Sequence, residues 1–209
     1  MVRIALIHAT ELSIPPTKKA FASIWPQAEP VHLMDDSLSR DRLRGKETSS
    51  RISALADYAI SVDSQAVLYT CSAFGKAISD VQRRLQFPVF KPNEAMFELA
   101  FKAGEKIAML ATFKPSIQSM EKEYYEAAAK GATLTTHLVE GAREASDSGN
   151  LTLHNHLIAE AIKRFSDFDA VMLAHFSMSP ALELCESVIR IPVFTAPETA
   201  VKKIRECSF

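Results

Sequence analysis

The residue best placed to do chemistry in this sequence is Cys71. It follows an apolar run, residues 67–70, and precedes the small and hydroxyl residues Ser72 and Ala73. This pattern predicts a strand that delivers a thiol to the start of a helix, where backbone N–H groups and the helix dipole favour thiolate over thiol. Free cysteines are often buried and inert. Here the flanking hydroxyls and the predicted helix start favour a reactive Cys71.

A second stretch, residues 169–177, has the same pattern and carries His175 where the first carries Cys71. A lone histidine is most often a structural residue, but the match to Cys71 favours a proton carrier, a role that histidine fills near neutral pH. Two proton carriers on opposite walls of a cleft suit proton transfer at a carbon next to a carboxylate. One takes a proton from one face while the other gives a proton to the opposite face. We therefore predict that Cys71 and His175 are a catalytic pair.

Such chemistry needs hydrogen-bond donors for the substrate carboxylate and for the enediolate that forms from it. Hydroxyls and backbone N–H groups after the predicted strand ends can supply them. N-capping explains any one of these hydroxyls alone, whereas the set favours a shared site. His8, at the end of the first predicted strand, is either a further contact or a buried structural residue. The predicted substrate-binding residues are His8, Ser72, Ala73, Thr112, Ser116 and Ser177.

Other kinds of site find little support. His154 and His156 have no third partner for a metal ion, and no glycine-rich nucleotide-binding motif is present. We therefore expect no metal and no cofactor. The net charge of -1 gives no electrostatic reason to bind nucleic acid or an anionic membrane. A small carboxylate-bearing substrate in a cleft is the expected partner.

The expected location is the cytoplasm. The N-terminal run lacks the length and cleavage site of a signal peptide, and no apolar stretch is long enough to span a bilayer. The three cysteines, at positions 71, 185 and 207, show no pairing pattern and no C-x-x-C spacing. Cys185 fits an apolar helical pattern and is expected in the core, and Cys207 lies in a charged tail.

The candidate residues must be positioned by strands and helices, which are predicted to alternate along the chain. In the first part, short apolar runs predict strands near residues 4–8, 31–34 and 67–70, and the short segment 87–90 predicts a strand or an extended turn. Helices are expected over 18–25, 48–60, from about 75 to 85, and over 93–104, with a loop over 9–16 and a polar segment over 35–41. The charged run 121–126 is expected to be a solvated helix face. This order is typical of a parallel sheet with helices on both faces.

The pattern then restarts from Lys106. Segment 4–7 recurs as 107–110, segment 88–90 recurs as 192–194, and Asp63, Ala66, Val67 and Ala77 recur 104 positions later. A near-constant offset along the whole chain indicates an internal duplication. We predict an α/β fold of two pseudo-symmetric parallel-sheet halves with the active-site cleft between them, since ligands bind beyond the carboxyl ends of such strands. The predicted halves are residues 1–92, with Cys71, and 93–209, with His175, in which 93–104 and 197–209 are crossing helices.

These residues, together with the repeat, resemble the aspartate/glutamate racemase superfamily, which includes glutamate, aspartate and hydantoin racemases, maleate isomerase and arylmalonate decarboxylase. The resemblance covers nearly the whole chain. It rests on the duplicated halves and on short motifs. The Pro15-Pro16 loop is similar to that of the decarboxylase and isomerase branch. The other motifs are Thr70-Cys71-Ser72-Ala73 at the first catalytic cysteine, Ala111-Thr112 with Ser116 at the carboxylate site, and Leu173-Ala174-His175 at the second cysteine.

The resemblance implies a cofactor-independent enzyme acting at the α-carbon of a small amino acid or related acid, without pyridoxal phosphate or metal. In the racemases two cysteines exchange the protons, whereas this sequence has His175 in place of the second. A racemase or isomerase with a Cys/His pair is the leading hypothesis. The alternatives are a single-cysteine decarboxylase or lyase of a malonate-like acid and a non-catalytic carboxylate-binding protein. A homodimer is expected only because dimers are common.

Overall fold

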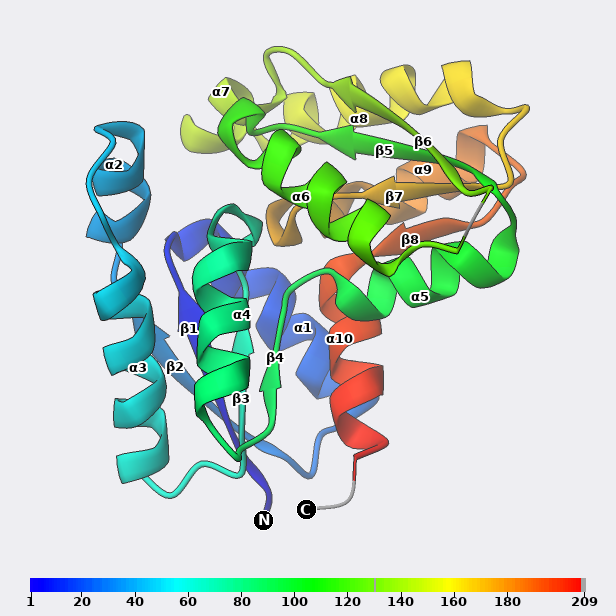
Figure 1. Ribbon diagram of the computed structural model, residues 1–209. Coiled ribbons are helices and arrows are strands. Elements are labelled where there is room, and N and C mark those ends of the chain that lie inside the picture. The colour runs from blue at the N-terminus through cyan, green and yellow to red at the C-terminus, as the bar shows by residue number, and fades with distance from the viewer. Residues whose placement is uncertain (130, 208–209) are drawn as a thin grey trace.

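Two four-stranded parallel sheets organise the chain in the computed structural model, which describes residues 1–129 and 131–207 (Figure 1). The first sheet has the order β2-β1-β3-β4 and the second the order β6-β5-β7-β8, so the two repeat one topology. This confirms the predicted α/β fold of two pseudo-symmetric halves. The strands are β1 (Arg3–His8), β2 (Glu29–Met34), β3 (Ala66–Tyr69), β4 (Val89–Phe90), β5 (Lys106–Ala111), β6 (Thr133–Leu138), β7 (Ala170–Leu173) and β8 (Val193–Thr195).

Helices follow the strands in both halves. The α-helices are α1 (Ile14–Ile24), α2 (Ser37–Leu43), α3 (Ser49–Ser61), α4 (Gly75–Arg84), α5 (Glu94–Ala103), α6 (Lys114–Ala127), α7 (Ala142–Asp147), α8 (Leu151–Ile162), α9 (Leu182–Val188) and α10 (Ala196–Arg205). Short 3-10 helices are η1 (Glu11–Ser13), η2 (Ser72–Phe74), η3 (Lys163–Phe165) and η4 (Phe176–Ala181).

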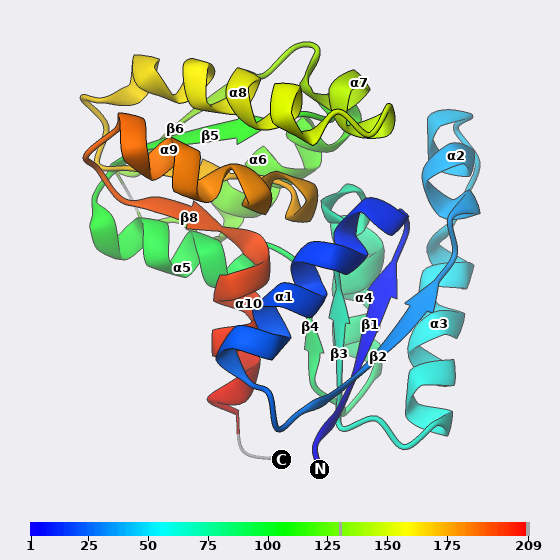
Figure 2. The same ribbon diagram turned by 180° about the vertical axis from the view of Figure 1, so that it is seen from behind.

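The central strands are apolar on both faces, because helices cover both sides of each sheet. One core joins the facing sides of the two sheets and includes Leu6 and Leu68 from the first and Met109 and Met172 from the second. Two outer cores lie under α3 and α4 and under α8 and α9. Figure 2 shows α8 and α9 in front of the second sheet. Burial on both faces explains why these strands are uninterrupted apolar runs.

Two helices join the halves. Helix α5 packs against β7 and β8 of the second sheet, and α10, the last helix, packs against α1 of the first half. Both views place α1 and α10 side by side (Figures 1 and 2). The guanidinium of Arg205 also donates a hydrogen bond to the carbonyl of Ile24 (2.7 Å). The first half therefore buries one of its helices, α1, against α10.

In both sheets a side-chain oxygen accepts backbone hydrogen bonds at the start of a central strand. In the second half the Asp169 carboxylate accepts hydrogen bonds from the backbone N–H groups of Glu105 and Lys106 (2.9 and 2.8 Å). In the first half the side-chain oxygen of Gln65, 104 positions earlier, accepts the N–H of Arg3 (2.6 Å). The duplication thus extends to side-chain contacts at the amino ends of the strands.

The structure corrects three sequence-based expectations about elements. Helix α1 begins at Ile14 rather than after the Pro15-Pro16 pair, because the first turn of a helix does not need the N–H that proline lacks. The polar segment 35–41 is largely helix α2. On α6 the expected solvated run contains Glu123 and Tyr124, both of which are buried.

Candidate active site

A cavity of about 160 Å³ lies between the two halves, at the carboxyl ends of β3, β5 and β7. Figure 1 shows that the strands of the two sheets point toward a common region near α2, α4 and α7. Both halves supply lining side chains, as expected for a duplicated α/β protein. The lining residues are Thr10, Ser13, Ser39, Arg40, Leu43, Thr70, Cys71 and Ser72 from the first half and Phe113, Ser116, Arg143, His175, Phe176 and Ser177 from the second.

Cys71 lies directly after β3 in extended backbone and is followed by η2, with its side chain partly exposed in the cavity. Burial raises the pKa of this thiol above its ordinary value, and the Ala73 N–H and the charges of Arg42 and Arg143 oppose the rise only in part. The backbone N–H that follows the strand does favour thiolate, as expected, but burial outweighs it. A single 3-10 turn separates Cys71 from α4, which begins at Gly75.

His175 occupies the equivalent position after β7 and is held by hydrogen bonds from its own half. Its Nδ1 accepts the backbone N–H of Thr112 (3.2 Å) and lies 3.1 Å from the hydroxyl of the same residue. Its Nε2 is 2.8 Å from the Oγ of Ser116, whose hydroxyl donates to the carbonyl of Phe113 (2.8 Å). Because Nδ1 accepts the Thr112 N–H, the network assigns the proton of a neutral ring to Nε2, which donates to Ser116.

Burial, with smaller contributions from Arg143 and His154, lowers the pKa of His175 to about 3. At neutral pH the pair therefore consists of a protonated thiol and a neutral imidazole. A thiol can give a proton and a neutral imidazole can take one, so the resting protonation states suit opposite roles. Both ring nitrogens of His175 already have protein partners, whereas Cys71 is a partly exposed residue of the cavity wall.

Two arginines give the cavity its positive charge. Arg40 comes from α2 and Arg143 from α7, and both also line an adjoining hollow at its mouth. Each arginine has an acidic neighbour on its own helix or cap, Asp36 and Asp147 respectively. Guanidinium groups beside hydroxyls are well suited to bind a carboxylate.

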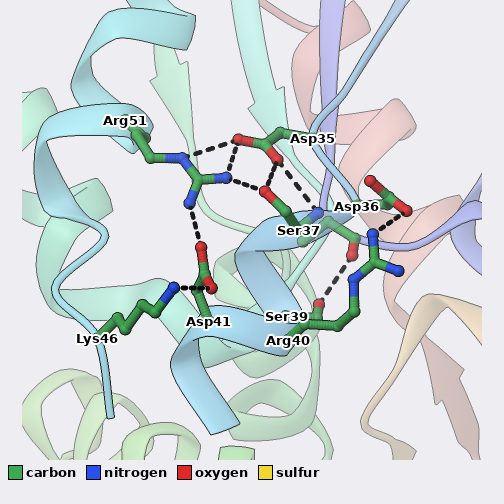
Figure 3. Close-up of polar contacts among 9 residues, drawn as sticks. Asp35, Asp36, Ser37, Ser39, Arg40, Asp41, Lys46 and Arg51 are labelled. Atoms are coloured by element: carbon green, nitrogen blue, oxygen red, sulfur yellow. Dashed lines mark hydrogen bonds and ion pairs between the residues drawn. The ribbon is translucent and has the colours of Figure 1, made fainter. Parts of the chain in front are cut away.

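An ion-pair network holds α2 over the cavity (Figure 3). Arg51 of α3 binds Asp35 through Nε (3.0 Å) and Nη2, and binds Asp41 through Nη1 (2.8 Å). On the cavity side, the Ser39 hydroxyl donates to the carbonyl of Ala9 (2.8 Å). These contacts position the helix that supplies Ser39, Arg40 and Leu43 to the cavity lining.

The structure brings together five of the eight predicted site residues on the cavity wall: Cys71, His175, Ser72, Ser116 and Ser177. The other three lie behind the wall. Thr112 binds His175, Ala73 offers its backbone N–H to Cys71, and His8 is fully buried beneath Ser13 and Thr70. Ser13 and Thr70 therefore separate His8 from the cavity, so His8 is not placed to contact a ligand there.

Sequence reasoning missed both arginines. They follow the second strand of each half, at positions 40 and 143, an offset of 103 that falls within the range of the repeat. Applying the repeat to the segments after β2 and β6 would have found them. Their helices have only 7 and 6 residues, too short for an amphipathic pattern to reveal.

In residues 1–129 and 131–207, no group of three or more His, Cys, Asp or Glu side chains has the arrangement needed to hold a metal ion. Within the same residues, no helix has the length and apolar character required to span a membrane.

The sequence matches no protein-family model and no curated protein, but solved structures match over nearly the whole chain. An aspartate racemase homologue from Pyrococcus horikoshii is 16% identical, with a TM-score of 0.75 over 99% of this chain and 98% of that chain. The Picrophilus torridus aspartate racemase is 13% identical, with a TM-score of 0.76 over 98% and 94% of the two chains. An allantoin racemase from Klebsiella pneumoniae is 16% identical, with a TM-score of 0.73 over 98% and 86%. The chain therefore shares its fold with these racemase structures.

Proposed function

We propose that this chain is a cofactor-independent racemase or isomerase that moves a proton at the carbon α to the carboxylate of a small amino acid or related acid. The observation that carries the proposal is that Cys71 and His175, from equivalent positions in the two halves, line one cavity. The solved structures that share the fold include aspartate, glutamate and allantoin racemases, which favours this class of reaction.

In the proposed reaction the substrate carboxylate binds Arg40, Arg143 and the hydroxyls of the wall, and the same groups stabilise the enediolate. His175 breaks the Cα–H bond by taking the proton on a ring nitrogen, and the thiol of Cys71 gives its proton to the opposite face. The products are the inverted acid, an imidazolium and a thiolate, so protons and charge balance. The reverse transfer starts from that second state and runs in the other direction.

One observation favours a second candidate, a decarboxylase of a malonate-like acid. Both ring nitrogens of His175 are engaged by Thr112 and Ser116, so this ring must give up a partner before it can accept a proton. Decarboxylation needs only Cys71. The carbon–carbon bond breaks with loss of carbon dioxide, its electron pair forms the enediolate, and the thiol protonates the carbon.

Proton exchange in deuterated water tests both candidates. Aspartate, glutamate, hydantoins and substituted malonates are incubated with the wild type, Cys71→Ser and His175→Ala, and α-deuterium and carbon dioxide are measured. Racemisation predicts α-deuterium incorporation that is lost in both variants. Decarboxylation predicts carbon dioxide release that is lost in Cys71→Ser and survives in His175→Ala.

Cys207→Ser is the matched control, because this thiol lies outside the cavity and contacts the carbonyl of Lys203. It should retain wild-type activity. A carboxylic acid that raises the melting temperature without turnover, in the wild type and in Cys71→Ser alike, would instead favour a non-catalytic binding protein.

A further inference from the structure

A buried chain of hydrogen bonds connects the outer edge of the first sheet to the cavity wall. His32 lies on the edge strand β2 and is partly exposed, whereas His8, on the neighbouring strand β1, is fully buried. The His32 Nδ1 is 2.9 Å from the His8 Nε2. The His8 Nδ1 is 2.8 Å from the Ser13 hydroxyl and 2.9 Å from the Thr70 hydroxyl. Ser13 and Thr70 line the same cavity as Cys71.

We propose that His32 and His8 form a proton relay that exchanges protons between solvent and the cavity wall beside Cys71. The proposal rests on the proposed function, because a thiol that gives its proton to carbon must regain one before it can act again in the same direction.

The hydrogen-bond partners assign a direction to the chain. The Ser13 hydroxyl donates to the carbonyl of Thr10 (2.8 Å), and the Thr70 hydroxyl donates to the carbonyl of Ile7 (3.2 Å). Both oxygens are thus free to accept, so the His8 Nδ1 carries the proton and its Nε2 accepts from the His32 Nδ1. Among the described residues no partner is hydrogen-bonded to the His32 Nε2. Both rings therefore point a proton inward and leave an acceptor at the outer end.

The surroundings keep both rings neutral, as a relay requires. Burial and then the neighbouring His32 lower the pKa of His8 to about 3. Burial and then the charge of Lys18, from α1, lower the pKa of His32. The two rings stack with centroids 5.1 Å apart and planes at 19°, which fixes their relative orientation. Each imidazole therefore releases one proton when it accepts another and does not remain as an imidazolium.

The second half has different residues at the positions of His8 and His32, so this chain of hydrogen bonds is not a result of the duplication. Ile4 pairs with Ala66 as Ile107 pairs with Ala170, so Leu6 corresponds to Met109. His32 pairs with Leu6 and Thr136 pairs with Met109, so the second half has Thr136 at the position of His32. At the position of His8 the second half has Ala111, and the hydroxyl and N–H of the next residue, Thr112, lie against His175. The complete chain thus occurs in the half that holds the thiol.

The proton transfer balances without a net charge on the relay. A hydronium ion from solvent protonates the His32 Nε2 and is left as water, while the Nδ1 proton of His32 passes to the His8 Nε2. The Nδ1 proton of His8 passes to a hydroxyl of Ser13 or Thr70, and the proton of that hydroxyl crosses the cavity to the thiolate. Both rings end in the opposite tautomer and return when a proton leaves the cavity by the same route.

Nuclear magnetic resonance of protein labelled with ¹⁵N-histidine tests the relay without a substrate. We expect both rings to be neutral Nδ1–H tautomers at pH 7, and we expect the buried His8 proton to exchange with solvent through His32. His32→Asn keeps an amide donor near the position of Nδ1 but cannot pass a proton, so this exchange should slow about tenfold or more. The control, His137→Asn, changes a histidine on β6 of the second half, outside this hydrogen-bond chain, and should leave the exchange unchanged.

With whichever acid of the panel is turned over, His32→Asn should lower kcat at constant KM, and added imidazole should restore it. Unchanged His8 exchange in His32→Asn, or Nε2–H tautomers, overturns the relay even if turnover is found. Slowed exchange with no turnover of any acid supports the relay and counts against the proposed function. A purely structural His32 predicts a loss of activity that imidazole does not restore.

Discussion

Cys71 and His175 hold equivalent places in the two halves, yet their environments differ in kind. The thiol faces the cavity and its pKa is raised by burial. The imidazole has both nitrogens occupied by its own half, and its pKa is lowered to about 3. Each group is therefore held in its uncharged form at neutral pH, which suits a cavity that must bind an anion without an opposing thiolate.

The raised pKa predicts how Cys71 reacts with iodoacetamide. The thiolate is the reactive form, so the alkylation rate should rise with pH to a midpoint above the ordinary thiol value of about 8.5. Arg143→Gln should move the midpoint further upward, because it removes a charge that favours thiolate. The rates are measured by mass spectrometry in a Cys207→Ser background, where Cys185 remains buried. A midpoint below 8 would contradict this assignment.

The hydrogen bonds of His175 predict a contrast between two substitutions. Ser116→Ala removes the acceptor for the Nε2 proton and should lower the free energy of unfolding by about 1 to 3 kcal/mol, the usual cost of an unpaired buried donor. Thr112→Val removes a hydroxyl but leaves the backbone N–H on Nδ1, so it should cost less. Urea unfolding of both variants measures the difference. Equal losses would argue against the Nε2–H tautomer.

At the residue scale, sequence alone located the thiol, its partner and three hydroxyls of the cavity wall. It could not locate Arg40 and Arg143, because which way a short helix turns its side chains depends on tertiary packing. It also could not place His8 behind the wall. A strand end predicts that a side chain is near the cleft, but not whether neighbouring hydroxyls cover it.

At the scale of the elements, ion pairs hold α2 in place. It is a seven-residue helix beside the cavity, and Arg51 ties it to α3 through Asp35 and Asp41. These groups are partly exposed, so the network contributes modestly to global stability, on the order of 1 kcal/mol. Its main effect is expected to be local order in α2.

Limited proteolysis tests this role. Trypsin can cleave after Arg40, Arg42, Arg44 and Lys46 in α2 and the segment that follows it. Arg51→Ala should increase cleavage there several-fold, because the opening free energy of this segment falls while the global stability changes little. Arg84→Ala, which removes an exposed pair with Asp57, is the control and should leave the cleavage rate unchanged. Equal rates in both variants would assign no anchoring role to Arg51.

Element order was readable from the sequence because buried parallel strands are short apolar runs and each is followed by an amphipathic helix. All eight strands lie within a few residues of the predicted runs or their repeats. Helix α2 was missed since its polar composition, Ser37 to Leu43, contains one buried residue, Leu38. The start of α1 was missed because Pro15 and Pro16 were interpreted as a loop.

At the scale of the whole molecule, a buried carboxyl lies where the halves meet. Glu123 of α6 lies against Gly75 at the start of α4, where a Cβ atom would come within 3.0 Å of its Oε2. Neither carboxylate oxygen has a hydrogen-bond partner among the described residues, and the Lys91 ammonium is 3.9 Å away. Burial, only partly offset by Lys91, raises the pKa of Glu123 to about 7.

This carboxyl predicts a pH-dependent stability. Between its unfolded pKa, about 4.5, and its folded pKa, about 7, the unfolded chain loses the proton first, so the free energy of unfolding falls as pH rises. Glu123→Gln should match the wild type at pH 4 and be more stable at pH 8.5 by on the order of 2 to 3 kcal/mol. Guanidinium unfolding at both values measures this. Glu121→Gln, on the same helix, should show no such gain, and a destabilised Glu123→Gln at pH 8.5 would contradict the assignment.

The duplication was the strongest signal at this scale, because a constant offset along the chain cannot arise from apolar composition alone. It predicted two similar sheets and a cavity between them. The offset could not predict the buried carboxyl between α6 and α4, because Glu123 and Gly75 come from non-equivalent elements of the two halves.

The packing of α10 on α1 has a consequence for how the protein is made. The hydrogen bond between Arg205 and Ile24 joins residues 181 positions apart, so α1 leaves the ribosome long before its covering helix exists. The first sheet can form during synthesis, but the apolar face of α1 stays uncovered until α10 has been made. We expect the nascent first half to remain open to proteases and chaperones until α10 is released.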